Sequence, residues 1–336
     1  MAIASREAAA TLAPQGGFRL THGGALSSVR IAFTVYGRAL DAPAILVCHA
    51  ITGNSKVHEW WGDVVGPGML LDTDRYCVIG SNVIGSCYGS TGPRSLDKDG
   101  LPYGRRFPVV GIEDMVRAQR EALDLLGVRH LHAVIGGSLG GMQALEWGAA
   151  YPSLVDKVIA IGATGRLSPM AIGLNSIARA AINLDPAEGL KVARMIGMLS
   201  YKSAALLWQR HGRKHNRDRE NPAASLDARF DVEGYLQHQG DKLAARMDPD
   251  AFLYLTKAMD LYELDAADWR TPALLVGIES DWLYPPDEVR ATAEQLGPYG
   301  AYAELKSDHG HDGFLADAAQ LAELVGPFLE APALVV

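Results

Sequence analysis

The feature that most constrains the fold of this chain is an alternation of short apolar runs with amphipathic segments. In residues 111–127, for example, apolar residues recur every three or four positions, as on one face of a helix. Runs that are short and uniformly apolar are typical of parallel strands buried on both faces. The alternation therefore predicts an α/β doubly wound protein with a mostly parallel sheet and helices on both faces. The predicted strands are AILVCHA (44–50), YCVIGSNV (76–83), LHAVIGG (131–137), KVIAIGA (157–163), ALLVGI (273–278) and AYAELKS (301–307).

The alternation stops between residues 164 and 270, where mainly helical patterns occur. An all-helical block inside an α/β chain is typical of an insertion, and we interpret this one as a lid. We therefore expect a first part of the core at 1–163, a helical lid at 164–270 and a second part of the core at 271–336. The alanine-rich start of the chain and its APALVV end are expected to be loose tails.

The strongest chemical signal is a Gly-x-Ser-x-Gly pattern made by Gly136, Ser138 and Gly140, directly after a predicted strand and before a predicted helix. This context is the signature of a nucleophile elbow, a turn so sharp that the serine takes strained backbone angles and its neighbours must be small. The turn lifts the serine hydroxyl above the edge of the sheet. We therefore expect Ser138 to be a catalytic nucleophile.

A serine is a weak nucleophile, so it needs a neighbouring imidazole and an acid that fixes the imidazole's tautomer. In proteins with this elbow the three residues follow the chain order Ser, acid, His. The acid is expected just beyond the strand at 273–278, where Glu279 and Asp281 both occur, and Asp281 is favoured because it lies further into the loop. The histidine is expected past the last strand, where His309 and His311 each stand beside an aspartate.

Acyl chemistry at a serine also needs backbone donors for the oxyanion of the tetrahedral intermediate. One donor is expected to be the N–H of Leu139, the residue after the nucleophile. The second is expected from the loop after the strand at 44–50, which we interpret as the third strand of the sheet, and Ile51 is the favoured residue there.

Net charge, cysteine spacing and targeting signals indicate which partners and which cellular compartment to expect. The net charge of -8 argues against nucleic acid as the main partner. The cysteines Cys48, Cys77 and Cys87 show no CxxC or Cys/His metal spacing, which predicts reduced thiols and no metal site. Neither a signal peptide nor a membrane span is recognisable, so we expect a cytoplasmic protein.

Several motifs together resemble the homoserine O-acetyltransferase family of α/β-hydrolase-fold acyltransferases. The resemblance covers most of residues 20–320 and implies the α/β-hydrolase fold. It also implies that His311, in the family's G-H-D-x-F-L stretch, is the catalytic histidine, and that His309 is a loop residue. The matching stretches are HAITG (49–53), DTDRYCVIGSNVIGSCYGSTGP (72–93), FPVVGIEDMVRAQ (107–119), GGSLGGMQALEW (136–147), ARMIGMLSY (193–201), YLQHQGDK (235–242) and HGHDGFL (309–315).

The same resemblance implies how an amino-acid acceptor is held. An amino acid is a zwitterion, so its pocket needs an anion for the ammonium and a cation for the carboxylate. By resemblance Asp312 binds the amino group, Arg194 binds the carboxylate and Tyr201 lines the same site. Asn54 and Tyr88 are further candidates for the pocket.

By resemblance the reaction is a ping-pong acyl transfer from acetyl-CoA, a co-substrate, to L-homoserine in methionine biosynthesis, with no permanently bound cofactor and no metal. The lid is expected to exclude water and to pair two copies into a homodimer. The chain departs from the family at LDPAEGLKVAR, where a longer stretch is usual, so its lid is expected to be short.

Other functions remain open from the sequence. A succinyl donor, or serine as acceptor, fits the same motifs. A serine esterase or thioesterase keeps the three catalytic residues but needs no zwitterion pocket. A binding protein without activity is disfavoured because all three residues are present.

Overall fold

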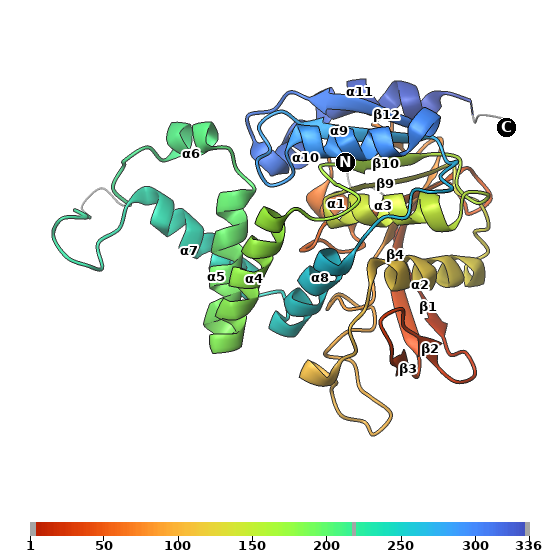
Figure 1. The fold of residues 1–336 in the computed structure, drawn as a ribbon, viewed down its shortest axis with the longest axis horizontal. Helices are drawn as coiled ribbons and strands as arrows, with labels where there is room; N and C mark the ends of the chain where they lie inside the picture. Colours follow the sequence, from red (N-terminus) through yellow and green to blue (C-terminus); the bar gives the residue numbers. More distant parts are fainter. Residues whose placement is uncertain (1–4, 217–219, 333–336) are drawn as a thin grey trace.

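The computed structural model describes residues 5–216 and 220–332, which form a layered α/β core with a helical segment projecting to one side (Figure 1). The core is built on an eight-stranded sheet with the order β1-β4-β8-β5-β9-β10-β11-β12. From β8 onward in that order the strands run parallel, whereas β4 is antiparallel to both of its neighbours. This architecture confirms the predicted fold class. The strands are β1 (Ser5–Leu12), β4 (Val29–Gly37), β5 (Ala44–Cys48), β8 (Cys77–Ser81), β9 (Ala133–Gly137), β10 (Val158–Ile161), β11 (Ala273–Ile278) and β12 (Gly300–Leu305).

The first two strands of this sheet were not predicted, and the expectation that the alanine-rich start is a loose tail is wrong. Strand β1 pairs antiparallel with β4, from Ser5 opposite Tyr36 to Leu12 opposite Val29. Its residues are small or polar for the most part, and only Ala10 and Leu12 are buried. An edge strand with so little buried apolar surface has a hydrophobic pattern too weak to recognise in sequence. The APALVV end lies largely outside the described residues.

Helices cover both faces of the sheet, and the strand residues alternate between them. In β5, Leu46 and Cys48 join the core cluster on the side of α2, α3 and α9, whereas Ile45 and Val47 join the cluster on the side of α11. Both faces are therefore apolar, which explains the uniform runs in the sequence. Each fully buried aliphatic side chain contributes roughly 1.5–3 kcal/mol. These helices are α2 (Ile112–Leu125), α3 (Leu139–Ala150), α9 (Pro286–Gln295) and α11 (Ala318–Glu330).

Short elements connect the larger ones. They are β2 (Phe18–Arg19), β3 (Ala25–Leu26), α1 (Val57–Trp60), β6 (Val65–Gly66), β7 (Leu71–Asp72), α10 (Gly313–Ala316) and 3₁₀ turns at Gly104–Arg106, Gly297–Tyr299 and Gly310–Asp312. The turn at Gly310–Asp312 follows β12, so the segment with His309 and His311 lies at the carboxyl end of the sheet. The loops after β5, β9, β11 and β12 all leave this same end of the sheet.

The helical segment between β10 and β11 has clear start signals. The side chain of Ser168 accepts a hydrogen bond from the N–H of Ala171, and that of Asp185 accepts from the N–H groups of Ala187 and Glu188. Proline stands in the first turn of α4, α5 and α8, where its missing N–H costs no helical hydrogen bond. The helices are α4 (Pro169–Leu184), α5 (Pro186–Ser200), α6 (Ala204–Arg210), α7 (Asp231–Ala244) and α8 (Pro249–Leu261).

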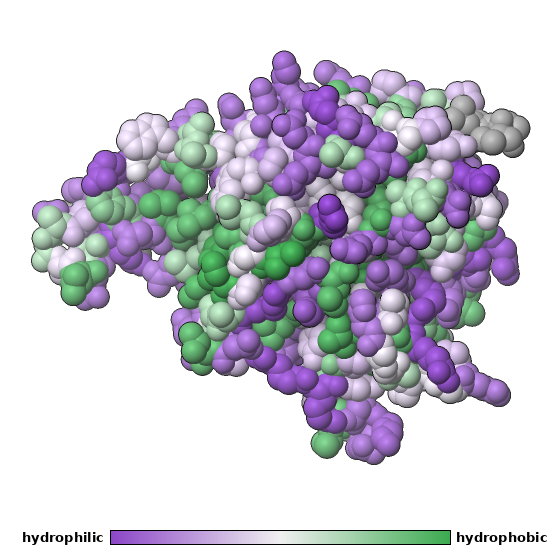
Figure 2. Space-filling view, viewed as in Figure 1, coloured by the Kyte–Doolittle hydropathy of each residue, from purple (hydrophilic) through white to green (hydrophobic). Residues whose placement is uncertain are grey.

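This helical segment carries much of the exposed apolar surface. Figure 2 shows hydrophobic residues gathered where the segment meets the core, and several large apolar side chains of α4 and α5 are exposed to solvent. Leu184 is 90% exposed and Ile177 is 58% exposed. Among the described residues, no helix combines the length and apolarity that crossing a membrane requires.

Candidate active site

Ser138 stands at a sharp turn between β9 and α3. Its φ of 57° is the sole positive φ of a non-glycine residue within 5–216 and 220–332. The neighbouring glycines make the turn sterically feasible, since a Cβ added at Gly140 would lie 2.1 Å from the carbonyl oxygen of Cys48 and one at Gly136 would lie 2.7 Å from the same oxygen. Backbone strain is thus concentrated at one buried serine, a combination typical of functional sites.

Asp281 and His311 form a buried pair on neighbouring loops. Nδ1 of His311 donates to Oδ2 of Asp281 at 2.7 Å, and their side chains are 3% and 0% exposed. The other carboxylate oxygen, Oδ1, accepts from the backbone N–H groups of Leu283 and Tyr284 at 2.9 and 3.0 Å. These three donors hold the carboxylate in one orientation, and the carboxylate in turn fixes the histidine ring.

The alternative acid and histidine lie elsewhere. Glu279 is exposed, and its backbone N–H donates to the carbonyl of Leu305 at the end of β12. The backbone N–H of His309 donates to Oγ of Ser307, and within the described part of the chain its imidazole makes no hydrogen bond. The structure thus brings together Asp281 and His311, and leaves Glu279 and His309 outside the pair.

The free nitrogen of His311 is the most distinctive atom of the site. Nε2 is buried and has no hydrogen-bond partner among the described residues. An unpaired buried polar atom lowers the stability of the fold, and in native proteins such atoms often have a catalytic role. The ring stacks on Tyr284 at 4.9 Å between centroids and lies 5.6 Å from the ring of Tyr201. Burial lowers the pKa of His311, but the charge and hydrogen bond of Asp281, with a smaller effect of Asp312, raise this pKa above its ordinary value overall. His311 is therefore suited to accept a proton.

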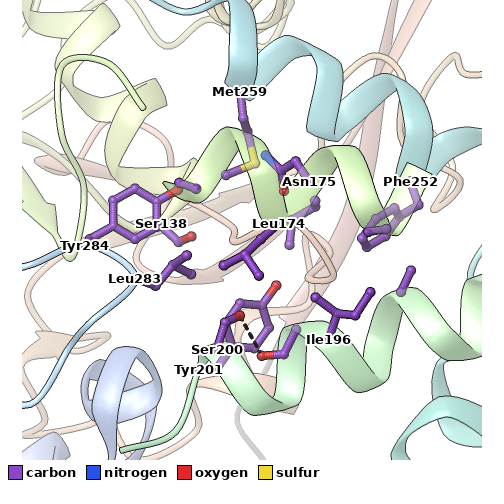
Figure 3. Close-up of a pocket in the computed structure, with 15 residues that line it drawn as sticks. Ser138, Leu174, Asn175, Ile196, Ser200, Tyr201, Phe252, Met259, Leu283 and Tyr284 are labelled. Carbon is purple, nitrogen blue, oxygen red and sulfur yellow. Dashed lines mark hydrogen bonds between the residues drawn. The ribbon is translucent and has the colours of Figure 1, made fainter. Parts of the chain in front are cut away.

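Sequence reasoning missed Tyr284. Its ring stacks on the imidazole, and it lines the same cavity as Ser138. Burial raises the pKa of Tyr284, so the phenol stays neutral. Figure 3 shows Ser138 and Tyr284 next to one another on the wall of a cavity. A tyrosine three residues after the acid has no sequence signal that separates it from an ordinary core aromatic residue.

A cavity of about 30 Å³ lies at Ser138, between the core and the helical segment (Figure 3). Helices α4, α5 and α8 supply most of the lining, and core loops supply the rest. The lining is largely apolar, so a reacting group there is shielded from water. The lining residues are Ile51, Ser138, Ala171, Leu174, Asn175, Ala178, Ala193, Ile196, Gly197, Ser200, Tyr201, Phe252, Met259, Leu283 and Tyr284.

Both expected oxyanion donors lie near the nucleophile. Ile51 follows β5 and lines the same cavity as Ser138. Leu139 is the first residue of α3, so its N–H has no partner inside the helix. The two residues expected to supply the oxyanion donors therefore both lie beside the nucleophile, one in the cavity wall and one next to it in the chain.

The residues expected to hold an amino-acid acceptor gather around Tyr201. The guanidinium of Arg194 lies 5.9 Å from the Tyr201 ring centroid, and the N–H of Asp312 donates to the Tyr201 carbonyl at 3.2 Å. The carboxylate of Asp312 is already paired, because Nζ of Lys202 lies 2.8 Å from its Oδ2. Sequence reasoning missed Lys202, although it directly follows a matched stretch, because a lysine after a helix is usually solvated.

Of the expected substrate residues, Tyr201 lines the cavity formed by the described residues, whereas Arg194 and Asp312 do not. Asn54 and Tyr88 lie outside this lining as well. Oδ1 of Asn54 accepts from the N–H of Lys56 at 2.7 Å, which makes a local turn before α1. Arg246 donates to the hydroxyl of Tyr88 at 2.6 Å. Both side chains are engaged in holding loops.

The end of α5 is fastened to the two loops that carry the acid and the histidine. The indole N–H of Trp282 donates to the carbonyl of Lys202 at 3.1 Å, and Oγ of Ser203 donates to the carbonyl of Asp308. Gly310 has a φ of +66°, and a Cβ there would lie 2.7 Å from the backbone nitrogen of Ser203. The helical segment and the catalytic loops are therefore in direct backbone contact.

Comparison with known proteins places this fold and site in a family. A family model described as alpha/beta hydrolase fold matches residues 43–318. The structure of homoserine O-acetyltransferase from Bacillus anthracis superposes with a TM-score of 0.89 at 22% identity, covering 99% of each chain. That of esterase E22 superposes with a TM-score of 0.87 at 24% identity, covering 97% of this chain and 100% of the esterase. The chain belongs to the proteins of the α/β-hydrolase fold.

Curated relatives narrow the family further. The homoserine O-acetyltransferase of Symbiobacterium thermophilum is 43% identical over 366 residues, covering 98% of this chain and 96% of the relative. The enzyme of the same name from Geobacter sulfurreducens is 43% identical and covers 93% of this chain and 94% of the relative. Within the α/β-hydrolase fold, this chain is a member of the homoserine O-acetyltransferase family.

Proposed function

We propose that this protein transfers an acetyl group from acetyl-CoA to the side-chain hydroxyl of L-homoserine, a step of methionine biosynthesis that we place in the cytoplasm. The observation that carries the proposal is the 43% identity, over nearly the whole of both chains, to a relative named homoserine O-acetyltransferase. The buried Asp281 and His311 pair beside Ser138 supports acyl transfer through an acyl-serine. Among the described residues, no group of three or more His, Cys, Asp or Glu side chains is arranged to hold a metal ion.

In the proposed first half-reaction, the hydroxyl of Ser138 gives its proton to Nε2 of His311 while Oγ attacks the thioester carbonyl carbon. The N–H groups of Ile51 and Leu139 stabilise the oxyanion. The carbon–sulfur bond then breaks, and the sulfur takes the proton from His311 and leaves as free coenzyme A. Asp281 stabilises the imidazolium that forms between these steps.

In the proposed second half-reaction, the side-chain hydroxyl of L-homoserine gives its proton to His311 and attacks the acetyl carbon on Ser138. The bond between that carbon and the serine oxygen breaks, and the serine oxygen regains a proton from His311. The product is O-acetyl-L-homoserine. The free Nε2 of His311 suits both proton transfers, since nothing else in the described structure occupies it.

For the acceptor, we propose that Arg194 binds the carboxylate, that Asp312 binds the ammonium and that Tyr201 lines the site. The pair between Lys202 and Asp312 adds a condition to this assignment. The ammonium of the acceptor must displace Lys202 from the carboxylate or share the carboxylate with it. Charge balance makes the exchange feasible, because one cation replaces another.

The helical segment acts in this proposal as a lid, with residues 1–163 and 271–336 forming the core and 164–270 the lid. An acyl-enzyme in an open site would be hydrolysed, so exclusion of water decides between transferase and hydrolase. The largely apolar cavity lined by α4, α5 and α8 supports this interpretation.

We also propose that two copies pair through their lids. Support comes from α4, where Ile177 and Leu184 are exposed and stand two turns apart on one face of the helix. Contiguous exposed apolar surface is typical of protein–protein contacts. Sedimentation of the purified protein tests the pairing, and a monomer at all concentrations contradicts it.

The deciding experiment for the function follows thiol release from acetyl-CoA with and without L-homoserine, using Ser138→Ala as control. Release that depends on homoserine and disappears in the variant supports the transferase. Release that is equally fast without homoserine indicates hydrolysis. This alternative is considered because esterase E22 has a similar structure. Parallel assays with succinyl-CoA and L-serine determine the donor and the acceptor, since one methylene is worth only about 1–3 kcal/mol in a pocket.

A further inference from the structure

We propose that Arg246, in the link between α7 and α8, is a positioning residue for the oxyanion hole. It belongs to the helical segment, yet it holds the loop at residues 50–53 that carries the N–H of Ile51. This inference rests on the proposed function in one respect, namely that Ile51 supplies an oxyanion donor. It goes beyond that function because it makes part of the catalytic geometry depend on the lid.

The core holds one peptide unit of this loop. The N–H of Ile51 belongs to the same planar unit as the carbonyl of Ala50, and in a trans peptide the two point in opposite directions. That carbonyl accepts from the N–H of Gly53 at 2.8 Å, and Nδ1 of His49 lies 2.8 Å from it. The direction of the Ile51 N–H is therefore fixed by whatever holds the Ala50 carbonyl.

Arg246 holds a second peptide unit of this loop, the one between Thr52 and Gly53. The N–H of Gly53 belongs to the same planar unit as the carbonyl of Thr52, and Nη1 of Arg246 donates to that carbonyl at 2.7 Å. A hydrogen bond on the Thr52 side thus keeps the Gly53 N–H directed at the Ala50 carbonyl. Through two rigid peptide planes, Arg246 orients the N–H of Ile51.

A second contact fixes Arg246 itself. Its Nη1 donates to the hydroxyl of Tyr88 at 2.6 Å, and its guanidinium lies 5.8 Å from the Tyr88 ring centroid. The carbonyl of Tyr88 accepts from Nδ2 of Asn82, whose Oδ1 lies 2.8 Å from Nε2 of His49. Burial lowers the pKa of His49, so its neutral ring has one N–H and donates either to the Ala50 carbonyl or to Oδ1 of Asn82. The loop is thus held at the Thr52 carbonyl by Arg246 and at the Ala50 carbonyl by the N–H of Gly53.

Arg246 has no competing ion pair within the described part of the chain. The nearby Asp248 pairs with Arg94 at 3.3 Å instead. Its charged donor is therefore directed to the two oxygens of Thr52 and Tyr88, and hydrogen bonds from charged groups are stronger than neutral ones. An exposed arginine without a carboxylate partner would otherwise be expected to remain in solvent.

The test compares Arg246→Met, which keeps the aliphatic part of the side chain, with Arg246→Lys and with Arg105→Met as matched control. Arg105 also joins the core to the helical segment, through Asn183 and Asp250, but does not touch residues 50–53. The readouts are the acylation rate with p-nitrophenyl acetate, kcat and KM for L-homoserine, and the affinity for methaneboronic acid, whose tetrahedral serine adduct places an oxygen in the oxyanion hole.

We expect Arg246→Met to lower acylation about tenfold, less than the 10²–10³ lost with a whole oxyanion donor. The affinity for the boronic acid falls by a similar factor, the KM for homoserine is unchanged and Arg246→Lys recovers part of the loss. If Arg246→Met matches Arg105→Met in acylation and boronate affinity, or changes only KM, the inference is wrong. If the wild type shows no homoserine-dependent thiol release, the proposed function fails instead, while ester acylation and boronate binding still test Arg246.

Discussion

Replacing Asp281 by asparagine probes the pair with His311 most sharply, because the structure dictates how the new amide must lie. Oδ1 of Asp281 accepts two backbone N–H groups, from Leu283 and Tyr284. An asparagine keeps both bonds only if its oxygen takes that position and its NH₂ group faces the imidazole. The amide then donates to Nδ1 of His311, so the neutral ring carries its proton on Nε2.

That tautomer cannot accept a proton from Ser138. In serine enzymes with such a pair, loss of the correct tautomer lowers kcat by about 10⁴, which corresponds to about 5.4 kcal/mol. We expect a loss of this size in the rate of thiol release from acetyl-CoA by Asp281→Asn, measured before steady state. Glu279→Gln is the matched control, since this exposed acid lies two residues away on the same loop and should leave the rate unchanged.

The pH dependence gives a second readout of the same pair. Asp281 raises the pKa of His311, and the neutral imidazole is the base, so wild-type activity increases as the pH rises through this raised pKa. Without the carboxylate charge the pKa of His311 falls, and the acid limb of the residual activity moves to lower pH. An Asp281→Asn enzyme that keeps more than a tenth of the wild-type rate, with an unmoved acid limb, would refute the reasoning.

Three further predictions concern other parts of the molecule. Gly140→Ala should lower the stability by about 1–3 kcal/mol, seen as a lower Tm, because its Cβ would lie 2.1 Å from a backbone oxygen of β5; an unchanged Tm contradicts this. Burial and the charge of Glu113 raise the pKa of Glu146 to about 7, so the wild type loses stability as the pH rises from about 4.5 to about 7. Glu146→Gln should lack this slope in denaturant titrations, and an identical slope counts against the assignment. Lys202→Met should lower the KM for L-homoserine severalfold, because the acceptor's ammonium would no longer compete with Lys202 for the carboxylate of Asp312. A raised KM would contradict this competition and would show instead that Lys202 keeps the Asp312 carboxylate in its binding position.

The parallel part of the fold could be predicted from sequence because burial on both faces leaves uninterrupted apolar runs. In β5 and β9 all residues are buried, so no alternation disguises the strand. Strand β4 was missed although Val29, Ile31, Phe33 and Val35 are buried and their alternation is a strand signal. Strand β1 escaped prediction for a different reason. β1 gains its place mainly by backbone pairing with β4, an interaction that any residue except proline can make.

The candidate site was predictable where a residue's type and its local turn suffice. Ser138 follows from the glycine pattern, and Asp281 follows from its place after a strand. The choice between His309 and His311 depended on resemblance, because both stand beside an aspartate; only the three-dimensional turn at Gly310–Asp312 directs one of them to Asp281. The contacts of Tyr284 and Lys202 join segments far apart in the chain, so no local pattern encodes them.

The junction between the end of α5 and the catalytic loops has a consequence for protein engineering. The helical segment projects from the core in Figure 1, so it invites exchange with the corresponding helices of a relative. However, Ser203 donates to the carbonyl of Asp308, and Gly310 leaves no room for a side chain against Ser203. A chimera that exchanges the helices alone would pair a foreign helix end with the native histidine loop. Residues 201–203 and 307–312 should therefore be exchanged together, so that the transplanted helices keep their own histidine loop.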